Sequence, residues 1–217
     1  MTESSYRMLM TIERQAIEIE QITERLRTAD LELASARTRL REISFTDEET
    51  GLSDQRYLSV RLENEVARCR RFGHPLSLVL LDLDDVPGID GGLSHAAAEE
   101  ALREVAQTLL KGSRSIDVVA RHDGGGFAVL LVETPLDGAR AYAGRMADTL
   151  SGASWSHGGQ VTASFGVSSL PHGAATSDDL LRGAEEALES ARRTGTNRIA
   201  VWAGGNVTRW AGCEAAR

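Results

Sequence analysis

The first 45 residues carry an unbroken seven-residue repeat of apolar side chains and contain neither glycine nor proline. Position a of the repeat is occupied by Ile12, Ile19, Leu26, Leu33 and Leu40. Position d is occupied by Met8, Gln15, Ile22, Ala29, Ala36 and Ile43. This pattern is typical of one long helix whose narrow apolar stripe packs against a second helix. We therefore expect residues 1–45 to form a coiled-coil helix that makes a homodimer through residues 5–43.

The charges beside the stripe favour a parallel homodimer. In that arrangement Arg25 of one chain faces Asp30 of the other, and Glu32 faces Arg37, so both pairs are opposite in charge. The alternative is a single amphipathic helix that packs on its own domain. The narrow stripe disfavours this alternative, because a globular core covers a wider helix face.

Composition limits the partners and the compartment of the chain. Its 217 residues, 41% hydrophobic, can bury one core, and its formal net charge of −8 disfavours nucleic acid or an anionic membrane as a partner. The two cysteines, Cys69 and Cys213, lack the spacing of metal ligands and indicate free thiols in a reducing compartment. The apolar runs are short. We expect a soluble, cytoplasmic protein without a structural metal.

Helical and strand-like patterns alternate from residue 46 to residue 203. Helical periodicity covers residues 54–71, 95–110, 136–150 and 178–193, and strand patterns cover 76–83, 118–122, 127–132, 161–168 and 198–202. Strand 76–83 is continuously apolar and should be central, with both faces covered. We expect an α/β fold with a mixed five-stranded sheet flanked by helices over residues 46–203, followed by a loose tail over residues 204–217.

Several short motifs occur together at the spacing of one known family. They are Thr50-Gly51-Leu52, Gly73-His74-Pro75, Leu81-Asp82-Leu83-Asp84, the hairpin segment Arg121 to Phe127, Ser164-Phe165-Gly166-Val167 and Gly195-Thr196-Asn197. Over residues 46–202 the chain resembles the GGDEF domain of diguanylate cyclases, a nucleotide-cyclase-type fold. Members of that family condense two GTP molecules, one bound to each domain of an antiparallel pair, into cyclic di-GMP. The resemblance therefore implies nucleotide chemistry that needs a dimer, which the N-terminal helix would supply.

The resemblance also implies a damaged active site. Alignment on Phe127 places the five signature positions on Asp123, Gly124, Gly125, Gly126 and Phe127. The family holds Mg²⁺ with an aspartate at the end of the first strand, here Asp82, and with the acidic signature residues, whose positions are Gly125 and Gly126 here. Loss of these carboxylates removes hard oxygen ligands that the metal needs beside a triphosphate. We expect no catalytic residue, no metal and no cofactor, with Mg²⁺ relevant only if residual activity exists.

Other substrate positions of the family are altered as well. A lysine, a guanine-binding asparagine and a base-binding aspartate of the family correspond to Pro87, Asp90 and Glu99. Since a phosphate-binding lysine is missing and Asp85 adds negative charge, the resemblance implies weak or absent GTP binding. For Asp82, Asp84 and Asp85 a solvated acidic cluster at the strand end is favoured over a metal site. Asp123 could supply a carboxylate only if the hairpin register shifted.

The resemblance also implies that the residues of a second family site are present in this chain. Many members carry an inhibitory cyclic di-GMP site built from an Arg-x-x-Asp motif before the signature and an arginine on the next helix. These positions correspond to Arg114, Asp117 and Arg145. Arginine can donate two hydrogen bonds to the O6 and N7 edge of guanine, while an aspartate accepts from its N1 and N2 protons. The Arg-x-x-Asp pattern also occurs elsewhere in the chain, so the assignment depends on the spacing of this copy from the signature hairpin. The alternative is an exposed ion pair between Arg114 and Asp117.

The sequence therefore predicts a catalytically inactive GGDEF-like protein that acts as a cyclic di-GMP receptor and signals to an unidentified downstream protein. Two other functions stay open. The first is a protein-interaction scaffold that binds no nucleotide, and the second is a weakly active diguanylate cyclase. A GTP-binding subunit that does not turn over is disfavoured by Asp85 and Pro87.

Overall fold

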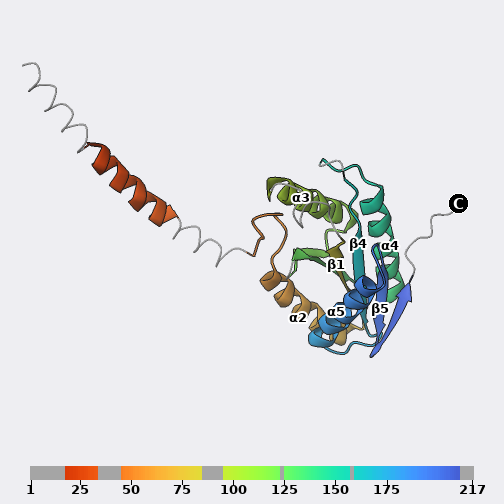
Figure 1. Ribbon diagram of the computed structural model, residues 1–217. Helices are drawn as coiled ribbons and strands as arrows, with labels where there is room; N and C mark the ends of the chain where they lie inside the picture. Colours follow the sequence, from red (N-terminus) through yellow and green to blue (C-terminus); the bar gives the residue numbers. More distant parts are fainter. Residues whose placement is uncertain (1–17, 34–44, 85–94, 123–124, 157–158, 211–217) are drawn as a thin grey trace, which may run out of the picture. The chain divides into compact units, whose positions relative to one another are not determined.

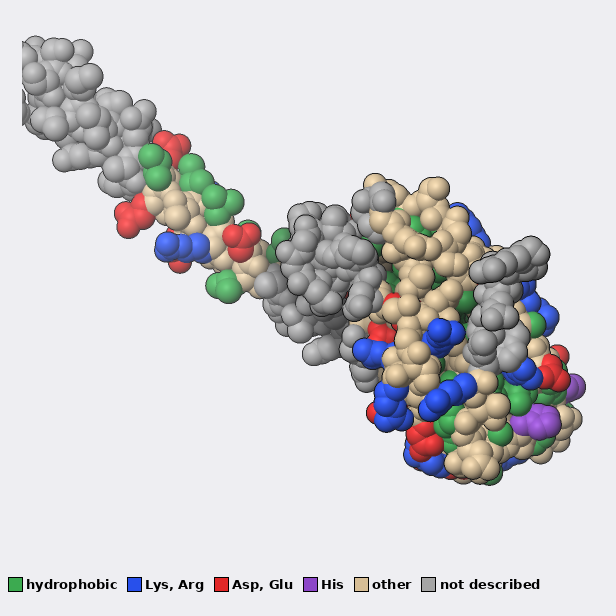
Figure 2. Space-filling model, turned by 45° about the vertical axis from the view of Figure 1, so that its right-hand side comes forward, with side chains coloured by type: hydrophobic (Ala, Val, Ile, Leu, Met, Phe, Trp, Pro, Cys, Tyr) green, Lys and Arg blue, Asp and Glu red, His purple; other side chains and the backbone are tan. Residues whose placement is uncertain are grey.

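The computed structural model describes residues 18–33, 45–84, 95–122, 125–156 and 159–210. The chain divides into two units, Met1–Ser44 and Phe45–Arg217. In the first unit, residues 18–33 are helical. Figure 2 shows hydrophobic side chains exposed along this helix. They include the a-position residues Ile19, Leu26 and Leu33, which are 65%, 61% and 51% exposed. The rest of the predicted dimerisation helix lies outside the described residues.

Within its described residues, the second unit is a six-stranded mixed sheet covered by four helices (Figure 1). The helices are α2 (Gln55–Phe72), α3 (His95–Gly112), α4 (Leu136–Gly152) and α5 (Ser177–Arg193). The strands are β1 (Leu76–Leu83), β2 (Val118–Arg121), β3 (Phe127–Val132), β4 (Ala163–Leu170), β5 (Ile199–Ala203) and β6 (Asn206–Trp210). The spatial order is β2-β3-β1-β4-β5-β6, and only β4 and β5 are parallel neighbours.

Strand β1 is central, as the sequence predicts, and pairs antiparallel with β3 on one side and β4 on the other. Its side chains alternate between two cores, because successive residues of a strand point to opposite faces. Val79 and Leu81 pack under α3 and α4, whereas Leu76, Leu78 and Leu80 pack under α2 and α5. Burial on both faces explains why the strand is apolar without interruption.

The last strand corrects the sequence prediction of five strands and a loose tail from residue 204. Residues 206–210 form β6, which pairs antiparallel with β5 from Ala203 opposite Asn206 to Ile199 opposite Trp210. Gly204 and Gly205 have φ values of 65° and 94° and form the two-residue turn between these strands. Such turns need positive φ, which glycine adopts without strain. The Gly-Gly pair therefore marks a hairpin here.

Local signals at the helix ends explain where several elements begin and stop. Asp54 caps α2 by accepting a hydrogen bond from the backbone N–H of Tyr57 at 2.9 Å, and Gly73 closes the helix in the left-handed conformation. Thr176 and Asp179 form a capping box at the start of α5. Among the described residues, no helix is both long and apolar enough to cross a membrane.

Candidate functional site

The carboxylate of Asp82, at the end of β1, forms an ion pair with Arg192. The Arg192 Nη1 atom lies 2.5 Å from Asp82 Oδ2, and Arg192 belongs to the last turn of α5. Both side chains border a cavity of about 520 Å³ between the end of β1 and α5, which is also lined by His122, Gly126 and Glu185. The guanidinium of Arg192 thus neutralises Asp82, the carboxylate that β1 contributes to this end of the sheet.

Asp84 has a structural role two residues further on. Its carboxylate accepts hydrogen bonds from the hydroxyls of Thr162 and Ser164, at 2.8 and 2.7 Å, and from the backbone N–H of Asn197 at 2.6 Å. These bonds tie the end of β1 to β4 and to the segment before β5. The prediction of a solvated acidic cluster is therefore wrong for Asp84, and Asp82 is ion-paired. Asp85 and Asp90 lie outside the described residues.

Gly126, at one of the two acidic signature positions, lies close against the backbone of β1. A Cβ atom on Gly126 would lie 2.8 Å from the carbonyl oxygen of Leu81, and Gly125 has a φ of 98°. The guanidinium of Arg121 donates to the carbonyl oxygens of both glycines. This close packing leaves no room for a side chain at position 126 without a shift of the hairpin. Asp123 and Gly124 lie outside the described residues.

The described residues at this end of the sheet do not fit a magnesium site of the kind that the family uses. Glu99 on α3 is bound by Arg103 at 3.0 Å, Asp82 is paired with Arg192, and Gly125 and Gly126 carry no ligand atoms in side chains. In the described part of the chain, no group of three or more acidic, histidine or cysteine side chains could hold a metal ion. Magnesium requires several oxygen ligands in nearly octahedral positions.

A second cavity brings together the three residues predicted to bind cyclic di-GMP. Arg114 lies in the turn after α3, Asp117 directly precedes β2, and Arg145 lies on α4, and all three line one cavity of about 150 Å³. Clefts that enclose drug-sized ligands measure roughly 300–1,000 Å³. A larger ligand would therefore lie across the mouth of this cavity, in contact with the two exposed arginines.

Backbone contacts fix the carboxylate of Asp117. One oxygen accepts a hydrogen bond from the backbone N–H of Arg114 at 2.9 Å, and the other accepts from that of Val132 at 3.1 Å. The alternative of an Arg114–Asp117 ion pair is not found: within the described ranges, neither the Arg114 nor the Arg145 guanidinium is ion-paired with a carboxylate. Two unpaired guanidinium groups thus flank an oriented carboxylate.

A close approach of α3 and α4 explains how these distant residues meet. Gly112, the last residue of α3, packs so tightly that a Cβ atom there would lie 2.5 Å from Cε of Met146 on α4. Gly112 thus marks a close contact between the end of α3, which precedes Arg114, and the helix that carries Arg145. Gly112 itself lines the cavity.

Sequence reasoning missed one aromatic residue of this site. Tyr142 lines the same cavity, is only 3% exposed, and forms a hydrogen bond of 2.8 Å between its hydroxyl and that of Ser113. Burial raises the pKa of Tyr142 to about 12, with a smaller contribution from Asp117. Its position three residues before Arg145, on the same helix face, is the signal that could have identified it.

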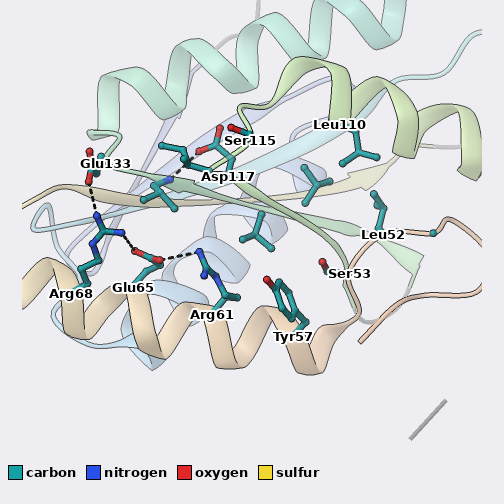
Figure 3. A pocket seen from close by; sticks show the side chains of 15 residues that line it. Leu52, Ser53, Tyr57, Arg61, Glu65, Arg68, Leu110, Ser115, Asp117 and Glu133 are labelled. Carbon is teal, nitrogen blue, oxygen red and sulfur yellow. Dashed lines mark hydrogen bonds and ion pairs between the residues drawn. The ribbon is translucent and has the colours of Figure 1, made fainter. Parts of the chain in front are cut away.

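A larger cavity that the sequence did not predict lies beside α2 (Figure 3). It measures about 570 Å³, and Asp117 lines it as well as the smaller cavity. Figure 3 shows a chain of ion pairs along one side: Arg61 contacts the buried Glu65 at 3.0 Å, Glu65 contacts Arg68 at 3.7 Å, and Arg68 contacts Glu133 at 3.2 Å. Of these three ion pairs, the one between Arg68 and Glu133 links α2 to the residue directly after β3, and the other two lie within α2.

The order of the mixed sheet and the helices on its two faces define an α/β domain of the nucleotide-cyclase type. The chain belongs to the family described as diguanylate cyclase, GGDEF domain, whose profile matches residues 44–198. It is 34% identical over 163 residues to the response regulator PleD of Caulobacter vibrioides, a match that covers 73% of this chain and 36% of PleD.

Two further relatives agree with this assignment. Diguanylate cyclase DgcP of Pseudomonas aeruginosa is 34% identical over 164 residues, covering 74% of this chain and 24% of DgcP. The chain thus spans about a third or less of the length of these two curated relatives. The solved structure of an active GGEEF domain of a diguanylate cyclase from Vibrio cholerae matches with a TM-score of 0.65 and 26% identity, covering 70% of this chain and 97% of that domain.

Proposed function

We propose that this protein is a catalytically inactive GGDEF-domain protein that binds cyclic di-GMP and passes the signal to a protein partner in the cytoplasm. One observation carries the proposal. Arg114, Asp117 and Arg145, which come from three separate segments, line one cavity, and both guanidinium groups lack an ion-pair partner among the described residues.

The donor and acceptor groups of this site suit guanine. Each arginine can donate two parallel hydrogen bonds to the O6 and N7 atoms of a guanine edge or to phosphate oxygens. A carboxylate has about four lone-pair directions, and the backbone N–H groups of Arg114 and Val132 use two of those on Asp117. The others can accept from the N1 and N2 protons of guanine. Adenine offers no N1 proton, so a guanine dinucleotide should bind in preference to its adenine counterpart.

Catalytic inactivity is proposed from the other end of the sheet. The glycines at positions 125 and 126 supply no carboxylate, and Arg192 occupies the one that Asp82 retains. Removing charged groups that stabilise a phosphoryl-transfer transition state costs orders of magnitude in rate. Relatives such as DgcP are named as cyclases, and we propose that this chain has kept their fold without their turnover.

Dimerisation through the N-terminal helix is part of the same proposal. Its exposed a-position residues form the stripe that a second copy of the helix would cover in a parallel coiled coil. The homodimer would then carry two receptor domains. Because the coiled coil links them, each domain is present at a high effective concentration for the other.

Calorimetric titration with cyclic di-GMP tests the receptor role. The wild-type protein should bind at tens of micromolar ligand or below, Arg114→Ala should weaken binding at least tenfold, and cyclic di-AMP should give no heat. Arg140→Ala removes a guanidinium from the same helix as Arg145 but outside the cavity lining, and should bind like the wild type. Absence of heat with the wild-type protein would refute the receptor role and leave the interaction scaffold.

Incubation with GTP and either Mg²⁺ or Mn²⁺, followed by chromatography, tests inactivity separately. No cyclic di-GMP should form. Product that accumulates with enzyme concentration would instead identify a weakly active diguanylate cyclase, whether or not the ligand also binds at Arg114.

A further inference from the structure

Tyr142 lies directly beside the arginine that the proposed ligand would contact. The two residues are three positions apart on α4, so their side chains lie on the same helix face. The guanidinium carbon of Arg145 lies 5.9 Å from the centre of the Tyr142 ring, within the range of a cation–π contact. Arg145 is exposed and the ring is buried, so the ring is the fixed partner of the pair.

The hydroxyl group anchors this ring to the end of α3. Ser113 donates its single hydroxyl proton to the carbonyl oxygen of Leu109 at 2.8 Å. The 2.8 Å contact between the hydroxyls of Ser113 and Tyr142 is then a bond donated by Tyr142. The ring is consequently held at both ends: by its backbone in α4 and by its hydroxyl at α3, next to the turn that carries Arg114.

An aromatic partner affects the hydrogen-bond donors of Arg145 differently from a carboxylate partner. A carboxylate beside Arg145 would occupy its N–H donors and compete with a ligand for them. The ring face attracts the cation and leaves the five N–H donors free. The phenol of Tyr142 is neutral near neutral pH even at its ordinary pKa of 10.0, and burial raises that pKa further, to about 12, so the group does not become a competing anion.

We propose that Tyr142 is a positioning residue of the candidate site: it holds the guanidinium of Arg145 at the cavity before the ligand arrives. The inference rests on the proposed function, since it assumes that Arg145 contacts cyclic di-GMP. A long arginine side chain loses rotamer freedom when it binds, and a contact that restricts it beforehand reduces this loss. Tyr142 thus strengthens binding without touching the ligand.

A double-mutant cycle with cyclic di-GMP as the titrant tests the proposal. Tyr142→Leu should weaken binding about three- to tenfold, because the ring contact and the restriction of Arg145 are both lost. Tyr142→Phe keeps the ring and should recover most of that loss. In an Arg145→Ala background, titrated to millimolar ligand, Tyr142→Leu should change the affinity less than twofold. Equal losses in both backgrounds would show a general structural role and overturn the proposal.

Ser113→Ala provides the same test if Tyr142→Leu does not fold. It removes the hydroxyl anchor and keeps the ring, so it should weaken binding about twofold in the wild-type background and leave the Arg145→Ala protein unchanged. Identical weakening in the two backgrounds would again refute the positioning role. Failure of the wild-type protein to bind cyclic di-GMP would refute the proposed function itself, whereas wild-type binding with an unaffected Tyr142→Leu variant would refute only this inference.

Discussion

A single methyl group at residue 126 should destabilise the domain. A Cβ atom there would lie 2.8 Å from the carbonyl oxygen of Leu81, whereas ordinary contacts begin at 3.4 Å. The hairpin would have to move away from β1 by about half an ångström, in a close-packed region that resists such movement. Gly126 does not have a positive φ, so the penalty is one of contact alone. Overpacking of this kind costs about 1–3 kcal/mol.

The assay is thermal unfolding of Gly126→Ala beside a matched control. Gly152→Ala adds the same methyl group at the end of α4, where nothing lies within 4 Å of the new atom. For a domain of this size, the expected penalty lowers the Tm of Gly126→Ala by about 2–12 °C. The control should be neutral or gain about 0.4–1 kcal/mol from the lower entropy of its unfolded chain. Equal Tm values for the two variants would refute the reasoning.

The same contact predicts the result of restoring the acidic signature. The double variant Gly125→Asp, Gly126→Glu should remain inactive with GTP and Mg²⁺, because the hairpin must shift to admit the new side chains and Arg192 still pairs with Asp82. The measurement is cyclic di-GMP formation by chromatography at a temperature where the variant is folded. Cyclase activity in this variant would mean that the hairpin and the ion pair present no obstacle.

Three further predictions concern other parts of the chain. Asp117→Ala should lower the free energy of unfolding in urea by about 1–3 kcal/mol, because the buried N–H of Val132 loses its acceptor, and should also abolish cyclic di-GMP binding; unchanged stability would contradict the first part. Leu26→Glu should convert a dimer to a monomer in light scattering, whereas Leu31→Glu, outside the a and d positions and 73% exposed, should leave it dimeric. The folded protein holds the phenolic proton of Tyr142 more tightly than the unfolded chain, because burial raises its pKa from 10.0 to about 12; the resulting stability is complete below pH 10 and is lost as the pH rises towards 12, so the wild-type Tm should fall more steeply over that interval than that of Tyr142→Phe.

The elements of the domain could be predicted from the sequence because their signals are local. The alternation of apolar residues, the caps and the continuously apolar β1 depend only on neighbours in the chain. They placed both ends of each of the four described helices and of five described strands of the domain within two residues. Strand β6 was missed because a five-residue strand at a sheet edge has a weak pattern. The Gly204-Gly205 turn brings β6 back to pair with β5. From composition alone, these glycines indicate a loose tail as readily as a turn.

Residue identity and spacing are enough to identify the family, the glycines at the acidic signature positions and the motif positions of Arg114, Asp117 and Arg145. The folded structure is needed to see which charges meet. It paired Arg192 with Asp82 across 110 positions, left the guanidinium groups of Arg114 and Arg145 without an ion-pair partner among the described residues, and placed Tyr142 of α4 beside Ser113 and Arg145. The physical reason is that such contacts depend on how closely α3, α4 and α5 pack on the sheet, which side-chain volumes throughout the core set together.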